Sequence, residues 1–476
     1  MLTRLLILNK IYNMGTTDTV LLIILFTILF IVLCRNILYY AGYSDYADHA
    51  DADQTEHMAG SNNKNRKWIR SKTCSNYMNS TTYDVLKSNN IQKTEDPDEA
   101  DIVFPCGYNN IDHEIKLLPH IDDRSNPKSN PKSNPNKIKP KIVFIIDGAD
   151  EITAKNYLWL NILNYHGYNK ARTLSPNTYI LTSDHKVVDL ARLTLEHKPG
   201  NLYIMKKNVQ RQTGLLITDK IEDIVSNKGS YVLAQQMLMD SYLVNLHKIN
   251  LRVYVVVICH QNRTTVYVYN NGFMYYTPKE FTPNPNNASS DNHITTGYVD
   301  RDMYTINPLT HTDFTRYLDS AEGSMYHAKS KPRILSDVEK SIRRSGQRIS
   351  VIVFSRIHEL IRDVFSSFKN KIGRSVDSNG KPIPIYNDIS VQIFGADVAI
   401  DSDLMPKIIE VNKGPDLDPK DERDSEVKKG LVDSIVRTGL TYTDRHNYNH
   451  EYNYASRDIN NEYGDAALIP VLEYTI

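Results

Sequence analysis

The feature that most constrains this fold is a pair of apolar runs near the C-terminus, joined by a short polar turn. The first run, Gly395–Asp401, reads GADVAID, and the second, Pro406–Asn412, reads PKIIEVN. Two such runs separated by a polar turn predict an antiparallel β-hairpin. Each run carries a carboxylate among apolar neighbours, Asp397 in the first and Glu410 in the second. The hairpin therefore has to hold two acidic groups in a largely apolar setting.

The expected register of the hairpin places these carboxylates opposite each other. Asp401, which ends the first run, is expected to face Pro406, and this register sets Asp397 about 5 Å from Glu410, measured between Cβ atoms. Asn412 shares the face of Glu410 because side chains alternate along a strand. A slip of one residue would put the carboxylates on opposite faces. Two carboxylates and an amide oxygen are hard ligands that suit Mg²⁺, although edge carboxylates that point into water would show the same pattern.

Cationic side chains mark two other strands. Lys206 ends an apolar run and precedes a glycine-containing turn, where a lysine beside backbone N–H groups can hold phosphate oxygens. Lys248, Asn250 and Arg252 alternate at the start of the most β-branched run, so they share one face. Two cations on one face suit polyphosphate or a carboxylate substrate, and the alternatives are surface lysines and a salt-bridged stripe. Neither a P-loop pattern nor GxGxxG is present.

The length of 476 residues allows two or three packed subdomains with appendages. Lys+Arg and Asp+Glu are 56 each, and this balance argues against a nucleic-acid-binding protein. Short β-rich runs alternate with amphipathic helices, which predicts an α/β fold of the α+β kind. The expected divisions are an N-terminal segment (1–18), an anchor (19–43), a tether (44–66), a small α/β subdomain (67–140) with a Pro/Asn/Lys/Ser loop (122–140), a main domain (141–440) and a tail (441–476).

Thr19–Cys34 holds no charged residue and, at about 1.5 Å per residue, is almost long enough to span a bilayer as a helix. Arg35 can reach the interface and the tyrosines that follow it can lie there. A single-pass transmembrane helix is therefore predicted, with a buried core helix or a cleaved signal peptide as alternatives. The count of Lys and Arg weakly favours a cytosolic N-terminus, yet we expect the main domain to lie on the cytosolic side.

The four cysteines, Cys34, Cys74, Cys106 and Cys259, show neither CxxC spacing nor the spacing of a zinc site. Four cysteines in so long a chain do not form a disulfide framework. We therefore expect reduced, structural thiols.

Four segments together resemble the tubulin–tyrosine ligase-like family of ATP-grasp ligases, over residues 140–440. The most specific is the hairpin, whose GAD and EVN elements are followed by Pro415 and Leu417. The others are KINLR at 248–252, the IMK strand at 204–206 with the loop after it, and the AQQML run at 234–238. The resemblance implies an ATP-grasp architecture of antiparallel sheets with flanking helices.

The resemblance also implies a role for each matching residue. Mg²⁺ would be bound by Asp397, Glu410 and Asn412. Lys206 and Lys248 would contact ATP phosphates, and Arg252 would orient the acceptor carboxylate or the γ-phosphate, so Lys248 and Arg252 are the expected catalytic residues. The remaining nucleotide contacts would come from a lid, a hinge and two further positions: Gln212, Thr213, Gly214, Leu215, Gln235, Gln236, Met237, Leu238, Asn250 and Thr295.

Three positions depart from the family pattern. Asn250 replaces an Asp, Thr296 replaces an Asn, and Tyr275 stands where an Arg is expected. The absent Arg would help hold the incoming amino acid or the γ-phosphate.

The resemblance therefore implies a membrane-anchored, ATP- and Mg²⁺-dependent ligase that joins a free amino acid to a protein or peptide carboxylate, with tubulin tails as candidates. No protein nucleophile is required. One alternative is a membrane-tethered pseudo-enzyme that binds nucleotide without ligating. Another is an ATP-grasp ligase acting on a small molecule.

Overall fold

The computed structural model describes residues 65–75, 77–119, 140–182, 185–208, 214–284, 289–374, 383, 385–445 and 467–475. The predicted anchor at 19–43, nearly all of the loop predicted at 122–140, and Gln212 and Thr213 lie outside these ranges. Among the described residues, no helix has both the length and the apolar character needed to cross a bilayer. The transmembrane helix and the orientation of the chain therefore stay predictions.

Strands and helices alternate through the described part of the chain. The strands are β1 (Lys67–Arg70), β2 (Gln92–Lys93), β3 (Ile102–Phe104), β4 (Ile142–Val143), β5 (Thr178–Ile180), β6 (Tyr203–Lys206), β7 (Leu216–Thr218), β8 (Leu233–Gln236), β9 (Leu243–Val244), β10 (His247–His260), β11 (Arg263–Tyr276), β12 (Ile389–Ile400), β13 (Pro406–Lys413) and β14 (Leu468–Thr475). The helices are α3 (Ser80–Ser88), η1 (Pro97–Glu99), α4 (Ile111–Lys116), α6 (Asp150–Thr153), α7 (Lys155–His166), α8 (Tyr168–Leu174), α9 (His185–Glu196), α10 (Ile221–Ser226), α11 (Ser290–His293), α12 (Met303–Ile306), α13 (His311–Asp319), α14 (Asp337–Arg344), α15 (Ile349–Ser366) and α16 (Glu422–Arg445).

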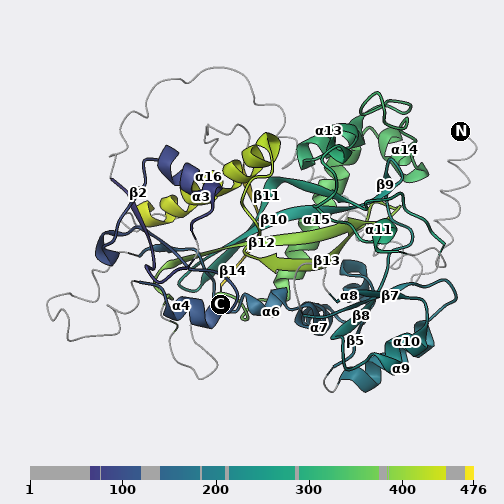
Figure 1. The fold of residues 1–476 in the computed structure, drawn as a ribbon, viewed down its shortest axis with the longest axis horizontal. Coiled ribbons are helices and arrows are strands. Elements are labelled where there is room, and N and C mark those ends of the chain that lie inside the picture. Colours follow the sequence, from purple (N-terminus) through teal and green to yellow (C-terminus); the bar gives the residue numbers. More distant parts are fainter. Residues whose placement is uncertain are drawn as a thin grey trace, which may run out of the picture. The chain divides into compact units, whose positions relative to one another are not determined.

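A large mixed sheet forms the body of the fold, in the order β14-β11-β10-β12-β4-β3-β1-β2 (Figure 1). The long strands β10, β11 and β12 are antiparallel, whereas β1, β3 and β4 are parallel to one another. β12 joins the two parts because its first residues pair with β4 and its later residues pair with β13. The predicted α/β fold is thus confirmed, and one continuous sheet runs across residue 140.

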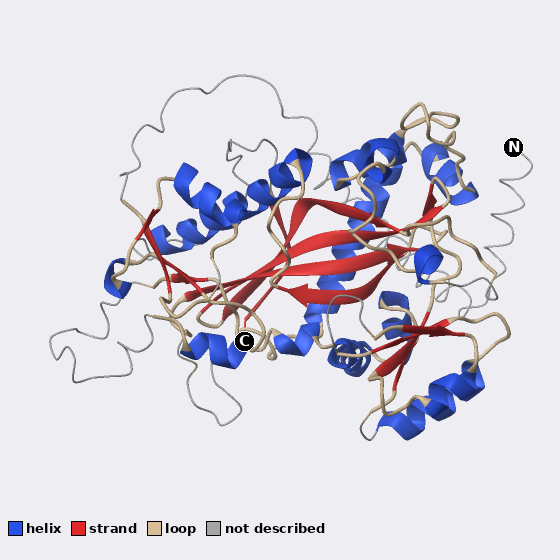
Figure 2. Ribbon diagram, in the orientation of Figure 1, coloured by secondary structure: helices blue, strands red, loops and turns tan. Residues whose placement is uncertain are grey.

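A second, smaller sheet has the order β5-β8-β6-β7 and is wholly antiparallel. One face packs against α9 and α10 through a cluster of buried residues that includes Leu193, Tyr203 and Ile224. The other face carries Ile204 and Met237. Figure 2 shows this sheet as a group of strands separate from the long strands of the large sheet.

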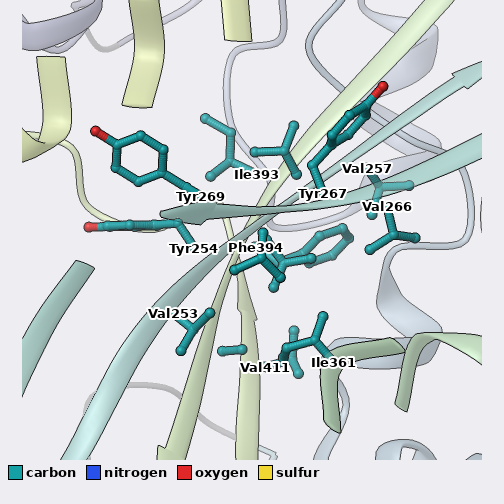
Figure 3. Packing of buried hydrophobic residues seen from close by; sticks show 14 of the residues in the cluster. Val253, Tyr254, Val257, Val266, Tyr267, Tyr269, Ile361, Ile393, Phe394 and Val411 are labelled. Carbon is teal, nitrogen blue, oxygen red and sulfur yellow. The ribbon is translucent and has the colours of Figure 1, made fainter. Parts of the chain in front are cut away.

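The large sheet is buried on both faces by helices. Phe394 on β12 contacts Phe365 of α15, with ring centroids 5.8 Å apart, while α16 contacts the opposite face through Tyr442 and Tyr267. Figure 3 shows Phe394 and Ile361 on one side of the strands and the neighbouring Ile393 on the other. This burial of both faces explains why β12 is apolar along its length and why Asp397 lies among apolar neighbours.

The end of the predicted tail forms β14, which pairs with β11 at the edge of the large sheet. This apolar segment of the tail therefore docks on the edge of the large sheet. Its pairing covers an edge that would otherwise expose unpaired backbone groups.

The prediction that the thiols are reduced is wrong for one pair, because Cys74 and Cys106 form a disulfide. Cys74 follows β1 and Cys106 follows β3, and these strands are parallel neighbours, so their C-terminal ends meet at one edge. That proximity comes from strand pairing and is invisible in the spacing of 32 residues. Cys259 is a free, buried thiol, as expected.

We expect Cys74→Ser to lower the free energy of unfolding by about 2–3 kcal/mol, since a disulfide restricts the unfolded chain. Denaturant unfolding with and without dithiothreitol provides the measurement. Dithiothreitol should destabilise the wild-type protein and leave the variant unchanged. Equal sensitivity of both proteins to dithiothreitol would show that the bond does not stabilise the fold.

Candidate functional site

A cavity of about 1030 Å³ lies between the two sheets and gathers most of the predicted site residues. The large sheet contributes Asp397, Glu410 and Asn412, and the small sheet contributes Lys206. The cavity is also lined by further predicted residues: Leu215, Gln235, Gln236, Met237, Leu238, Lys248, Asn250, Arg252 and Thr295. Residues nearly 200 positions apart in sequence thus face one space.

The carboxylates of the hairpin lie opposite each other as predicted, but the register near the turn differs. Asp397 pairs with Glu410, whereas Pro406 pairs with Ile400 rather than with Asp401. The register shifts by one residue between Asp397 and Val398. A β-bulge in β13 therefore restores the pairing at the site, which is how bulges commonly re-aim side chains beside functional positions.

Arg252 clamps the first of these carboxylates. Its Nε lies 2.6 Å from Asp397 Oδ1 and its Nη2 lies 3.0 Å from Asp397 Oδ2. Burial raises the pKa of Asp397 to about 6; Arg252 opposes this shift and the nearby Glu410 adds to it. The facing ring of Tyr275 lies 5.0 Å from the guanidinium carbon. The guanidinium of Arg252 therefore lies between the carboxylate of Asp397 and the ring of Tyr275.

Glu410 is held from two sides. Asn412 Nδ2 donates to Glu410 Oε1 at 3.1 Å, and Lys155 Nζ lies 3.8 Å from Glu410 Oε2. Burial alone would raise the pKa of Glu410, but Lys155, Lys206 and Asn412 together hold it below its usual value. The site thus contains a charged carboxylate opposite a second carboxylate, with an amide oxygen beside them. These oxygen donors fit Mg²⁺, which binds carboxylates together with substrate phosphates.

Two buried lysines, Lys206 and Lys248, line the same cavity as this acidic pair. Lys206 Nζ donates to Gln235 Oε1 at 2.8 Å, and Lys248 Nζ donates to Leu238 O at 2.8 Å. Burial is the main cause that lowers the pKa of each lysine to about 8. An ammonium group desolvated in this way gains from an anionic partner, so the pair favours a polyphosphate.

The predicted hinge, Gln235 to Leu238, begins in the last two residues of β8 and continues beyond its end. The side chain of Gln235 is directed to Lys206 and Thr178. The backbone N–H groups of Gln236 and Met237 donate to Asn177 O and Leu202 O, both at 2.8 Å. Gln235 therefore lies in the middle of the small sheet and supports a lysine, whereas Met237 and Leu238 follow β8 and line the cavity.

Other predicted positions surround this end of the cavity. Gly214 has a φ of +73° and packs against the side chain of Lys207, and Leu215 after it reaches the cavity. His293 is 2% exposed, and neither ring nitrogen has a hydrogen-bond partner within the described chain. Burial lowers the pKa of His293 to about 4, with a further contribution from Lys248. The buried, neutral imidazole of His293 therefore lines the cavity beside Lys248.

Some cavity residues had no sequence pattern to reveal them. Lys155 opens α7 and reaches Glu410. Tyr108 belongs to the small α/β part, donates its hydroxyl to Phe144 O and packs against Gly414, whose φ is +57°. Their roles depend on contacts between segments that are distant in sequence.

The three positions that depart from the family pattern, Asn250, Thr296 and Tyr275, have different surroundings. Asn250 lines the cavity between Lys248 and Arg252 and so keeps the predicted face. Thr296 forms a bridge to Tyr276 of β11 through its backbone N–H. Tyr275, where the resemblance implies an Arg, lines the cavity with a neutral ring that lies against the guanidinium of Arg252.

Comparisons with known proteins agree with this geometry. A model of the tubulin-tyrosine ligase family matches residues 143–448, which is more than half of the chain. The tubulin polyglutamylase ttll-5 of Caenorhabditis elegans is 24% identical over 299 residues, 60% of this chain and 38% of that protein. Tubulin polyglutamylase TTLL6 of Homo sapiens is 25% identical over 309 residues, 63% and 31% respectively.

Tubulin monoglutamylase TTLL4 of Mus musculus is 22% identical over 295 residues, which is 61% of this chain and 22% of that protein. The chain thus spans less than half the length of these three relatives. The family model nevertheless includes every residue of the acidic hairpin and both buried lysines. The chain belongs to the tubulin-tyrosine ligase family.

Proposed function

We propose that the chain is an ATP- and Mg²⁺-dependent ligase that joins the amine of an amino acid to a protein or peptide carboxylate. The observation that carries this proposal is the facing pair Asp397 and Glu410 in the same cavity as the buried Lys206 and Lys248. Acidic groups for a metal and desolvated ammonium groups for phosphates are the parts that phosphoryl transfer needs. Family membership and the names of the relatives support ligation to tubulin as the first case to test.

In the proposed reaction, an oxygen of the acceptor carboxylate attacks the γ-phosphorus of ATP, and the bond from that phosphorus to ADP breaks. The amine then attacks the carbonyl carbon of the acyl-phosphate. A C–N bond forms, the C–O bond to phosphate breaks, and the amine loses its protons to water and the departing phosphate. Lys206 and Lys248 hold phosphate oxygens, and Arg252 orients the acceptor carboxylate or the γ-phosphate.

Asp397, Glu410 and Asn412 would hold Mg²⁺, which when bound neutralises phosphate charge and polarises the phosphorus centre. The chain supplies no nucleophile of its own in this scheme. Positioning of the reacting groups within the cavity would provide most of the rate enhancement.

The second candidate is a nucleotide-binding pseudo-enzyme. Tyr275 favours it, because this ring replaces a cation at the end of the cavity where the second substrate would enter. The acidic pair favours the ligase, since a binding protein has little need for two opposed carboxylates.

We expect amide formation to require Mg²⁺, ATP, an amino acid and a carboxylate acceptor together. The experiment supplies tubulin-tail peptides with single amino acids, and follows ADP release and the mass of each peptide. One ADP should appear for each amino acid added. Tight ATP binding without a mass change on any acceptor would instead support the pseudo-enzyme.

A further inference from the structure

Beyond the acidic pair, the cavity has a second end with aromatic walls. Phe273 and Tyr275 of β11 lie there with Tyr298 and Tyr304, and the N-terminal part of α16 with the loop before it closes that end. We name these four residues, together with Asp416 and Lys420, the aromatic subsite. Phe273 is 3% exposed and Tyr304 is 4% exposed, whereas Tyr298 is 83% exposed. The subsite thus grades from a buried aromatic wall to an open rim.

Most charges around the aromatic subsite are already paired with each other. Lys428 Nζ lies 2.7 Å from Asp424 Oδ2, and both side chains are almost fully buried. Arg301 pairs with Asp421. Binding a substrate carboxylate at either cation would require an existing ion pair to be broken or shared. For the buried pair this is costly, because it strands a desolvated carboxylate.

Lys420 is the exception among these cations. Within the described chain it forms no ion pair; its Nζ donates to Gly297 O at 3.0 Å and lies 4.3 Å from the ring centroid of Tyr298. Lys420 and Asp416 are both exposed. Burial of part of the side chain lowers the pKa of Lys420 and Lys428 lowers it further, whereas the nearby Asp424 and Asp416 oppose this shift. A carboxylate at Lys420 would therefore be favourable without displacing another carboxylate.

Asp416 is the corresponding anion. Its Oδ1 accepts the backbone N–H of Asp418 at 3.0 Å, and its carboxylate forms no ion pair within the described chain. The aromatic subsite thus offers one cation and one anion that lack ion-pair partners. An α-amino acid carries the complementary pair, a carboxylate and an ammonium group.

We propose that the aromatic subsite binds the amino-acid substrate, with its α-carboxylate at Lys420 and its amino group toward Asp416, and that it selects a neutral side chain over glutamate. This rests on the proposed ligase function and specifies its amine substrate. Glutamate would bring a second carboxylate to a place where Lys428 and Arg301 already have carboxylate partners. A neutral, and above all an aromatic, side chain would instead pack against the rings of the wall.

Arg252 does not supply the missing cation. Its Nε and Nη2 pair with the two carboxylate oxygens of Asp397, the ring of Tyr275 covers one of its faces, and the proposed function assigns its remaining donors to the acceptor carboxylate or the γ-phosphate. Tyr275 is therefore a specificity-determining position, because a neutral ring stands where the family resemblance implies an Arg.

The test uses the full chain saturated with Mg²⁺ and a non-hydrolysable ATP analogue, so that binding is measured without turnover. Isothermal titration with tyrosine, phenylalanine and glutamate gives the Kd of each. We expect tyrosine or phenylalanine to bind at least about ten-fold more tightly than glutamate, since an aromatic side chain gains contact with the rings of the wall while the second carboxylate of glutamate meets cations that are already paired. Glutamate binding as tightly as both aromatic amino acids would overturn the proposal.

A pair of variants tests the carboxylate contact. Lys420→Met should weaken tyrosine binding about ten-fold or more, and should leave the binding of tyrosinamide, which lacks the carboxylate, unchanged. Lys429→Met is the matched control, since Lys429 lies on α16 but pairs with Asp84. Equal losses for tyrosine and tyrosinamide in Lys420→Met would overturn the assignment of the carboxylate.

The outcomes also separate this proposal from the function on which it rests. If the ATP analogue binds but no free amino acid does, the aromatic subsite is wrong and nucleotide binding stands. If the analogue itself fails to bind with Mg²⁺, the proposed function fails, and the subsite fails with it.

Discussion

Glu410→Gln is expected to lower the rate of Mg²⁺- and ATP-dependent ligation by about 10³-fold or more, because it removes one of two carboxylates that face each other across the hairpin. Charge stabilisation of a transferring phosphoryl group by a metal site is worth several kcal/mol. The glutamine side chain keeps the shape of the Glu410 carboxylate but removes one of the two negative charges that Asp397 and Glu410 bring to the site. Single-turnover formation of ADP, measured over a range of Mg²⁺ concentrations, provides the rate.

The fold should survive this substitution. Glu410 is only part-buried, and the glutamine oxygen can still accept from Asn412 Nδ2, the 3.1 Å bond of the wild type. Glu473→Gln is the control, since Glu473 pairs with Arg263 at the β14 edge, outside the cavity. It should retain full activity. Wild-type turnover in Glu410→Gln, at any Mg²⁺ concentration, would contradict the metal-site assignment.

Much of the fold follows from local patterns. The predicted IMK strand at 204–206 lies in β6, the KINLR run at 248–252 lies in β10, and the hairpin runs form the end of β12 and nearly all of β13, because β-branched and apolar runs of this length suit a sheet buried on both faces. The spacing of Ile357, Leu360, Ile361 and Val364 likewise predicts a helix from about 349 to 369, and α15 covers 349–366. Period and composition are properties of a short segment, so they can be evaluated without knowledge of its neighbours.

The hairpin shows which residue pairs local patterns predict correctly and which they do not. Counting back from the turn gave the right partner for Asp397 but the wrong one for Pro406, because a bulge adds one residue to β13 between the two positions. β12 pairs in unbroken register with β10 on its other side, and the extra residue lies in β13. The sequence of two apolar runs does not contain that information.

The parts of the site that sequence analysis missed come from long-range contacts. Lys155 meets Glu410 across more than 250 residues, and the disulfide between Cys74 and Cys106 requires β1 and β3 to be neighbours. The charge balance around Lys420 is similar, since it depends on which carboxylates Lys428 and Arg301 have already taken. Each of these follows only when the order of strands in the sheets is known.

Lys206→Met is expected to weaken the binding of a non-hydrolysable ATP analogue by about 10²-fold at pH 7, because a hydrogen bond to a charged group contributes roughly 1.5–3 kcal/mol. The variant also leaves the buried Oε1 of Gln235 without its donor. Lys198→Met serves as the control, since Lys198 is an exposed lysine that does not line the cavity. An unchanged Kd in Lys206→Met would show that the phosphates lie elsewhere.

The pH dependence gives a sharper result, and its sign follows from the lowered pKa. Lys206 and Lys248 have pKa values of about 8 in the free protein, and a bound polyphosphate would raise both. Affinity is therefore fully present below pH 8 and is lost above it, by up to about ten-fold per pH unit for each lysine. Measured from pH 7 to 9.5, the slope of log Kd against pH should be about twice as steep in the wild type as in Lys206→Met, in which Lys248 alone still titrates. Identical slopes would mean that Lys206 does not lose its proton in this range, and that its ammonium group is stabilised by something other than the nucleotide.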